Sequence, residues 1–304
     1  MTRTWALGLA VAGVVLTAGC AAAVPAADSS AGAPLRIVAA ENFWGSIARQ
    51  LGGSRVTVTS IIDRPGTDPH DYEPTPRDAR AFARAQLVVV NGVGYDPWAD
   101  QLLAANPVGR RLVVNVGDLV GAHAGDNPHR WYAPADVERL IQAVSSDLQE
   151  LAPNDAAYFA AQRQRFEAQG LADYHRVLAD IRTKYADTPV GASESIFAPM
   201  ASALGLHLET PAGFLKAISE GAEPSAADKS AADEQIRNGS IKVYVYNGQN
   251  TTSDVRAQVD AARRRGIPVT TITETLTPAD VSFQEWQAGQ LERLAAALAK
   301  ASAR

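Results

Sequence analysis

The alternation of β-branched apolar runs with stretches of helical spacing constrains the fold of this 304-residue chain more than any other feature. The runs LRIVA, VTVTSII, LVVVN and LVVNV follow one another from Leu35, and PVGAS, IKVYVYN and PVTTIT follow in the last third of the chain. Such alternation predicts βα units that build a parallel sheet with helices on both faces. We therefore expect an α/β fold with two lobes, at residues 35–153 and 187–304.

The segment between these lobes, residues 154–186, has a different pattern. From Asp155 to Tyr185 it contains no proline and one glycine, and its apolar residues recur in steps of three and four. This spacing makes one helical face, so we predict one long helix that joins the lobes, with a cleft between them. Ligands of open parallel sheets usually bind at the carboxyl ends of the strands. The functional site is therefore expected in the interlobe cleft.

The beginning of the chain, residues 1–20 (MTRTWALGLAVAGVVLTAGC), has the pattern of an export signal. Arg3 precedes an apolar run from Trp5 to Leu16. This run is shorter than the roughly 20 residues that a spanning helix needs, and small residues follow it, as in a cleaved signal peptide.

The only cysteine, Cys20, ends this segment and cannot form an internal disulfide. The segment resembles a bacterial lipoprotein signal, in which the cysteine becomes the lipidated first residue of the mature chain, although leucine is more usual where this chain has Thr17. A cleaved soluble signal with an incidental cysteine is the alternative. Residues 21–34, rich in Ala, Ser and Pro, predict a flexible tether.

The charge of the chain argues against a nucleic-acid partner. The formal net charge is -5, and no basic stripe is visible in the sequence. Because binding to phosphate backbones needs clustered cations, we expect no role in nucleic-acid recognition.

Four residues are candidate metal ligands, two in each lobe: His70 in DPHDYEP, His129 in NPHRWY, Glu194 in GASESIF and Glu274 in TITETLTP. All lie at or just beyond a predicted strand or in a proline-bounded turn. Two imidazoles and two carboxylates supply up to six donor atoms, with a charge close to that of a divalent cation. A metal would also offset the cost of burying two carboxylates, which is high when they are unpaired.

The helix start after His70 is well marked. Thr75 is predicted as the N-cap and Pro76 as the first helical residue, and Asp78 is favourably placed against the helix dipole. His70 is therefore expected on the loop between the strand VTVTSII and this helix.

Each candidate also has a structural interpretation. His70 could cap the following helix, and His129 could pack in its turn beside the nearby tryptophan. Glu194 and Glu274 could stabilise the first amides of ordinary helices. The intervals between the four residues match no local metal motif, so spacing alone does not decide between ligands and structural residues.

Longer stretches around these candidates resemble one known family. DPHDYEPTPRDARAFARAQLVVVNGVGYDPW, followed by NPHRWY, resembles the metal-binding solute-binding lipoproteins of bacterial ABC importers, the TroA and ZnuA-like family for zinc and manganese. The resemblance continues through GASESIFAPMASALGL, EPSAADKSAADEQIRNGSIKVYVYN and GIPVTTITETLTPADVSFQEWQAGQLERL, and so covers nearly all of the mature chain. It implies two α/β lobes bridged by one long helix, with a metal held between them by His70, His129, Glu194 and Glu274.

The resemblance leaves the metal open between Zn²⁺ and Mn²⁺. Many zinc-type members have histidine where this chain has Glu194, and a long histidine-rich loop where it has only LVGAHAGD. Manganese-type members often have a carboxylate at the third position, as here, but commonly aspartate where this chain has Glu274. A carboxylate favours the harder Mn²⁺ in relative terms, yet the Irving–Williams order lets Zn²⁺ bind more tightly in absolute terms.

The function implied by the resemblance is capture and delivery without chemistry. We expect a monomer anchored through Cys20 to the outer face of the cytoplasmic membrane, which binds a divalent metal ion and passes it to an ABC permease. Affinity should fall as the pH drops through the histidine range near 6.5, because protonated imidazole cannot ligate.

Two other functions stay open from the sequence. One is a binding protein of the same architecture for a chelated metal or another small ligand, which would use Trp44, Trp98 or Trp131 in an aromatic-lined pocket. The other is a secreted metallohydrolase, which could use the same ligand types with an open coordination position. The sequence has no HExxH or GxSxG motif and no second metal cluster, which disfavours the enzyme.

Overall fold

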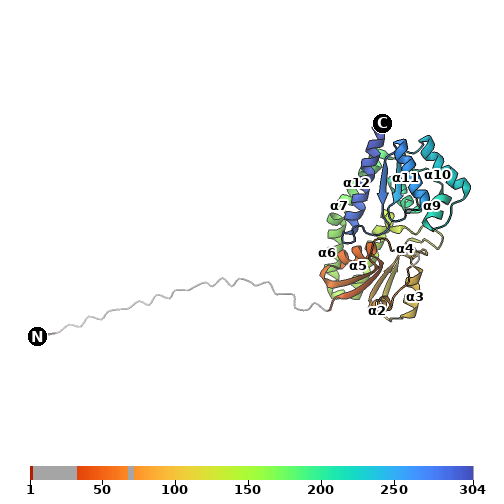
Figure 1. Cartoon of the computed structure of the whole chain (residues 1–304). Helices are drawn as coiled ribbons and strands as arrows, with labels where there is room; N and C mark the ends of the chain where they lie inside the picture. The colour runs from red at the N-terminus through yellow and green to blue at the C-terminus, as the bar shows by residue number, and fades with distance from the viewer. Residues whose placement is uncertain (3–32, 68–71, 304) are drawn as a thin grey trace. The chain divides into compact units, whose positions relative to one another are not determined.

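A computed structural model of the chain describes residues 1–2, 33–67 and 72–303. The predicted signal segment, Cys20 and His70 lie outside the described residues. From Ala33 onward the chain forms one compact unit that contains two four-stranded sheets (Figure 1). In the part of the chain that the structure describes, no helix combines the length and apolar character needed to cross a membrane.

The N-terminal sheet is parallel, with the strand order β2-β1-β3-β4. Its strands are β1 (Leu35–Glu41), β2 (Val56–Ile62), β3 (Leu87–Val90) and β4 (Leu112–Asn115). Its helical elements are α1 (Asn42–Gly52), η1 (Gly53–Arg55), α2 (Pro76–Arg84), α3 (Pro97–Ala105), α4 (Val116–Val120), η2 (Arg130–Tyr132) and α5 (Pro134–Leu151). Ile37 and Leu87 pack in a core with α1 and α5, whereas Val38 and Val88 pack with α2 and α3. Both faces of the sheet are thus covered, as the apolar strands predict.

The C-terminal sheet is also parallel and has the order β6-β5-β7-β8. Its strands are β5 (Pro189–Ala192), β6 (His207–Leu208), β7 (Val243–Asn247) and β8 (Val269–Ile272). Its helical elements are η5 (Ser195–Phe197), α8 (Ala198–Leu204), α9 (Ala212–Ser219), α10 (Ala226–Asn238), α11 (Ser253–Arg265) and α12 (Phe283–Ser302). Val243 and Val245 face a core shared with α8 and α12, whereas Tyr244 faces α10 and α11. The two parallel α/β sheets predicted from the sequence are confirmed.

The segment between the sheets is helical almost throughout, but it is not one uniform helix. It comprises η3 (Pro153–Asp155), α6 (Ala156–Arg165), a π-helical turn η4 (Phe166–Gly170) and α7 (Ala172–Tyr185). In the π turn, Leu171 N donates to Phe166 O at 2.9 Å. Phe166 and Leu171 are both buried although they are five positions apart, a spacing that an α-helix would turn away from a single face. The extra residue of the π turn keeps both in the core.

One apolar core runs through both sheets. It joins residues of β1 and β3 to residues of β5 and β7, and includes side chains of α1, α5, α7 and α12. Phe283 N, at the start of α12, donates to Ser46 Oγ of α1 at 2.9 Å. The two sheets are therefore held together by shared packing as well as by the connecting segment.

The predicted start of α2 is confirmed in detail. Thr75 and Asp78 form a reciprocal capping box, and Pro76 is the first helical residue. Since the box satisfies amides that would otherwise lack partners, it fixes where the chain leaves the segment that contains His70.

Candidate metal site

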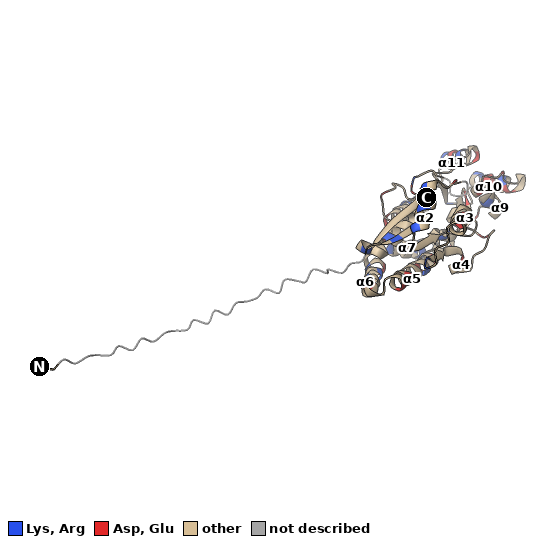
Figure 2. Cartoon of the chain, turned by 90° about the horizontal axis from the view of Figure 1, so that it is seen from below, with Lys and Arg blue, Asp and Glu red and all other residues tan. Residues whose placement is uncertain are grey.

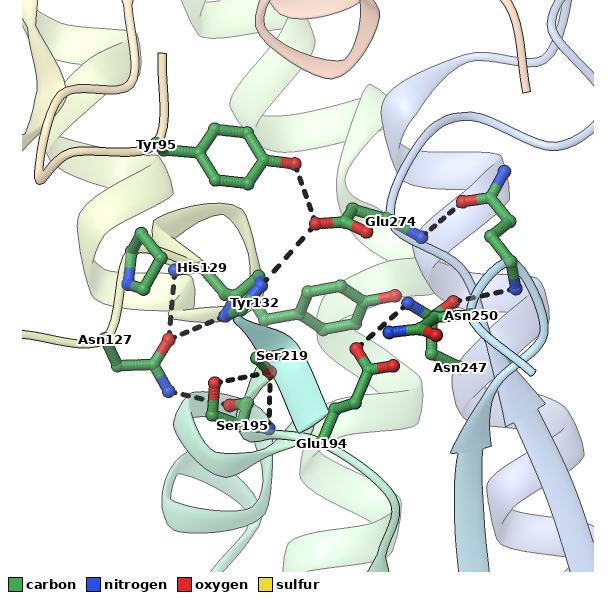
Figure 3. Close-up of polar contacts among 12 residues, drawn as sticks. Tyr95, Asn127, His129, Tyr132, Glu194, Ser195, Ser219, Asn247, Asn250 and Glu274 are labelled. Atoms are coloured by element: carbon green, nitrogen blue, oxygen red, sulfur yellow. Dashed lines mark hydrogen bonds and ion pairs between the residues drawn. The ribbon is translucent and has the colours of Figure 1, made fainter. Parts of the chain in front are cut away.

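His129 is buried at the entrance to η2, with 1% of its surface exposed. Its backbone N and its ring Nδ1 both lie against Asn127 Oδ1, at 3.0 and 2.8 Å. The Asn127 amide nitrogen donates to Ser195 O at 2.7 Å, so its oxygen is the atom that faces the histidine (Figure 3). Because that oxygen can only accept, Nδ1 carries the proton and Nε2 keeps the lone pair in the neutral ring.

The ring of His129 also packs as the structural interpretation expects. Trp131 meets it edge-on, with ring centroids 5.2 Å apart, and Tyr95 does so at 6.0 Å. This packing fixes the plane of the imidazole. The packing leaves Nε2 available for polar contacts, because this atom faces Glu274 of the C-terminal lobe.

Glu274 approaches His129 from the loop after β8. Its Oε1 lies 3.7 Å from His129 Nε2 and accepts a hydrogen bond from Tyr95 Oη at 3.0 Å (Figure 3). The backbone N atoms of Glu274 and Thr275 both donate to Gln249 Oε1, at 2.7 and 3.0 Å. One glutamine side chain thus holds the loop that presents the carboxylate.

Glu194 lies two residues after the end of β5 and is 2% exposed. Its Oε2 accepts from Asn247 Nδ2, at the end of β7, at 3.1 Å. Although Glu194 precedes η5, its side chain makes no capping hydrogen bond to that turn. The adjacent Ser195 carbonyl is the group that Asn127 binds, so the Glu194 segment is tied to the His129 turn across the two lobes.

The structure thus places some of the predicted ligands in contact and others only near one another. His129 and Glu274 face each other, and Glu194 is connected to them through Asn127. Within residues 33–67 and 72–303, no three His, Cys, Asp or Glu side chains are grouped as they would be around a metal ion. Since His70 is outside the described residues, the complete set of four ligands stays a prediction.

The distance between His129 and Glu274 is close to the distance between two ligand atoms of one metal ion. Two ligand atoms on one tetrahedral metal with bonds of roughly 2.1 Å lie about 3.4 Å apart, close to the observed 3.7 Å between Nε2 and Oε1. A cation between the two atoms would use the lone pairs of both. A proton on Nε2 would instead form an ion pair with the same carboxylate, so a proton and a metal ion would compete for this position.

Two further acids near the site, Glu41 and Asp96, were missed by the sequence analysis. Burial, followed by the neighbouring Asp96 carboxyl, raises the pKa of Glu41 well above 4.5, and Glu274 contributes in the same direction. Burial raises the pKa of Asp96 to about 6, even though it accepts from the backbone N atoms of Asn91 and Gly92 at 2.7 Å. The two carboxyl groups therefore lie close together beside the candidate site.

These missed residues carried a recognisable signal. Glu41 directly follows the apolar residues of the first strand, and Asn247 ends IKVYVYN. Both stand at the carboxyl end of a parallel strand, the same edge that identified the ligand candidates. Asn127 could have been found as the polar residue two positions before His129.

Together, these features define a two-lobed α/β protein with a polar site at the carboxyl ends of its parallel strands. Comparison with known proteins gives the family. Residues 37–297 match the model of the zinc-uptake complex component A, periplasmic (ZnuA) family, and the chain belongs to this family. The family resemblance noted from the sequence is confirmed.

Individual relatives cover less of the chain. The manganese-binding lipoprotein MntA of Halalkalibacterium halodurans is 30% identical over 157 residues, which are 50% of this chain and 51% of the relative. The iron-binding protein YfeA of Yersinia pestis is 28% identical over 137 residues, 43% of this chain and 44% of the relative. The chain thus spans about half the length of the curated relatives it matches.

Among solved structures, the chain is similar to a manganese-bound mutant of a periplasmic metal binding protein from Candidatus Liberibacter asiaticus. The TM-score is 0.73 at 18% identity, covering 86% of this chain and 98% of the other. At this identity the likeness supports the fold.

Proposed function

We propose that this protein captures a divalent metal ion outside the cytoplasmic membrane and delivers it to an ABC-type importer. The observation that carries the proposal is the contact between His129 and Glu274, in which an imidazole lone pair and a carboxylate oxygen from different lobes face each other at 3.7 Å. The ZnuA family match, and relatives named for binding manganese and iron, support a metal as the ligand.

The proposed ligands are His70, His129, Glu194 and Glu274. The described part of this set supplies one imidazole nitrogen and two carboxylates, each with a defined neighbour: Asn127 for His129, Asn247 for Glu194 and Tyr95 for Glu274. Groups that orient metal ligands in this way usually change affinity by 10- to 100-fold when removed. The chain therefore has the support that a preformed site requires.

Capture and release would need little movement. The apolar core shared by both lobes opposes a wide opening, and the hydrogen bond from Asn127 to Ser195 O joins the lobes beside the site. A small separation of the Ser195 segment from Asn127 would pull Glu194 away from the histidine side and weaken the site. We propose that docking on the permease causes this separation.

The transported ion is proposed to be Zn²⁺ or Mn²⁺. Carboxylate donors at two of the four positions suit Mn²⁺, which accepts higher coordination, and imidazoles suit Zn²⁺. The export signal at residues 1–20, the tether at 21–34, lipidation at Cys20, a monomeric state and the absence of enzymatic activity belong to the same proposal.

A second candidate function has one observation in its favour. A cavity of about 390 Å³ adjoins His129 and Ser195 and is lined largely by small and apolar residues, so a metal bound to a small organic chelator would have room there. The tryptophans predicted for such a pocket do not line it, because Trp44 and Trp131 are fully buried and Trp98 is 3% exposed. We therefore favour the bare ion.

The test is metal content and affinity. Residues 21–304 would be purified, analysed by mass spectrometry, stripped, and titrated calorimetrically with Zn²⁺ and Mn²⁺, alongside His129→Ala. His207→Ala is the matched control, since His207 is exposed and pairs with Glu209. One equivalent of metal that is lost in His129→Ala and kept in His207→Ala would support the site, whereas no heat with either ion would refute the proposal.

A further inference from the structure

A group of five arginines lies at the amino-terminal edge of the N-terminal sheet, and we call it the arginine edge. Its members are Arg36, Arg80, Arg84, Arg110 and Arg111. Arg36 lies near the start of β1, and Arg110 and Arg111 directly precede β4. Gln86 N donates to Arg36 O at 2.8 Å and Leu112 N donates to Gln86 O at 2.9 Å, so the beginnings of β1, β3 and β4 are level.

The sequence directly around four of these arginines is free of acidic residues. Although the net charge of the chain is -5, residues 79–95 and 101–117 contain four of these arginines and neither Asp nor Glu. The fifth, Arg36, lies near the start of β1. Among the ion pairs of the described residues, none includes an arginine of this edge. In the view from below, Lys and Arg positions, drawn in blue, lie around α2 (Figure 2).

Two of the five arginines are explained by folding. Arg36 Nε donates to Arg84 O at 2.9 Å, and Arg111 Nη2 donates to Phe82 O at 2.7 Å. Both therefore satisfy carbonyls at the C-terminus of α2, where cations are generally favourable.

The other three arginines have no such role. The side chains of Arg80, Arg84 and Arg110 are exposed and form no hydrogen bond with the described residues. Val108 and Val113, on either side of Arg110 in sequence, are 42% and 45% exposed. Unpaired cations next to exposed apolar side chains are the combination that an anionic membrane surface attracts.

We propose that the arginine edge rests on the anionic phospholipid surface of the membrane that carries the lipid anchor, an inference that depends on the proposed lipidation of Cys20. Arg36 follows Cys20 by 16 positions, a distance of at most roughly 55 Å when fully extended. The anchor would therefore keep these cations near lipid phosphates. Each arginine near such a surface contributes about fivefold to partitioning.

The orientation has a consequence for metal capture. The candidate metal site lies at the carboxyl ends of the strands, and β1 is seven residues long, or roughly 20 Å. With the arginine edge on the membrane, the site faces away from the lipid. The protein would collect the ion in this resting position and would turn on its tether to meet the permease.

The experiment measures vesicle binding without the lipid anchor. Residues 21–304, which include the whole compact unit from Ala33, would be mixed with vesicles of phosphatidylglycerol and phosphatidylcholine, or of phosphatidylcholine alone, and separated by flotation. We expect binding to the anionic vesicles that falls in high salt. The triple variant Arg80→Glu, Arg84→Glu and Arg110→Glu should bind roughly 100-fold more weakly, at about fivefold or more per arginine.

The matched control changes the same charge at exposed positions of α11, with Arg256→Glu, Arg263→Glu and Arg264→Glu. It should keep most of the binding. A second test variant, Arg80→Gln, Arg84→Gln and Arg110→Gln, avoids placing acids at the end of α2, where they are unfavourable, and should also lose binding.

The proposal would be overturned by equal binding of the unmodified chain to both vesicle types, or by equal losses in the α11 control and the arginine-edge variants. Titration of every variant with Zn²⁺ and Mn²⁺ separates this outcome from a failure of the proposed function. Metal affinity should be unchanged in all of them, because none of the substituted residues contacts the candidate metal site.

Discussion

The two lobes share a strand order but use equivalent positions differently. In each sheet the first strand lies between the second and the third, and the fourth is at the edge. Asn91 follows the third strand of the N-terminal sheet and donates to Pro128 O at 2.8 Å. Asn247 ends the third strand of the C-terminal sheet and donates to Glu194 Oε2 at 3.1 Å. One asparagine supports the turn that carries a histidine, and the other supports a carboxylate.

The acids near the candidate metal site also differ between the two lobes. Glu194 and Glu274, in the C-terminal lobe, accept hydrogen bonds from Asn247 and Tyr95. In the N-terminal lobe, burial and the neighbouring Asp96 carboxyl raise the pKa of Glu41, and Asp96 accepts from the backbone N atoms of Asn91 and Gly92. The difference teaches that similar sheets can orient site carboxyl groups with side-chain donors in one lobe and favour the protonated form of a buried carboxyl in the other.

Removing a proposed ligand should have the largest effect, which is a loss of metal affinity. We expect His129→Ala and Glu274→Gln each to weaken Zn²⁺ and Mn²⁺ binding by more than about 100-fold, the upper limit for changes in residues that only orient a ligand. Calorimetric titration of the stripped protein measures this loss. Wild-type affinity in Glu274→Gln would show that the C-terminal lobe does not supply this ligand.

The link between the lobes should have the next largest effect. Asn127→Ala removes the acceptor for His129 Nδ1 and the donor to Ser195 O, so metal affinity should fall by about 10- to 100-fold. Asn106→Ala is a suitable control because the Asn106 side chain donates to the Leu102 carbonyl of its own helix, α3. If both variants bind metal equally well, Asn127 does not orient the histidine.

The acids of the N-terminal lobe should affect stability rather than ligation. The pKa of Glu41 is raised in the folded chain, so its contribution to stability is fully present below about pH 4.5 and is lost as the pH rises through the raised value. Glu41→Gln replaces the carboxyl group with a neutral amide, so the variant does not lose this stability as the pH rises. We expect it to increase the free energy of unfolding at pH 8 by about 1–3 kcal/mol, the usual cost of an unsatisfied buried polar group.

Urea denaturation of wild type and Glu41→Gln, both metal-free, at pH 4.5 and pH 8 measures this difference. The two proteins should be closest in stability at the lower pH. A variant that is less stable than wild type at pH 8 would mean that the Glu41 carboxylate has a stabilising role in the folded protein.

The smallest effect is expected at the start of α2. Thr75→Ala removes the capping box formed with Asp78 and should lower the free energy of unfolding by about 1 kcal/mol. Ser282→Ala, which removes the equivalent capping box of α12, should cost a similar amount. Thermal unfolding followed by circular dichroism compares the two; a much larger loss in either would point to a role beyond capping.

Local patterns predicted much of the fold. The strand VTVTSII matches β2 at both ends, and Pro76 is the first residue of α2, as predicted. Residues close in sequence decide such features, because turn chemistry and apolar spacing act within a few positions. The π turn at Phe166–Gly170 was missed for the opposite reason, since it depends on which side chains the surrounding core accepts.

The sequence by itself determined the βα alternation, the start of α2 and the residue types of the candidate site. Only the tertiary structure decided that Nε2 of His129 faces Glu274, that Asn127 joins this turn to Ser195, and that Glu41 is buried beside Asp96. These contacts join residues far apart in the chain. Their geometry depends on how the two sheets pack on a common core, and no local pattern specifies that packing.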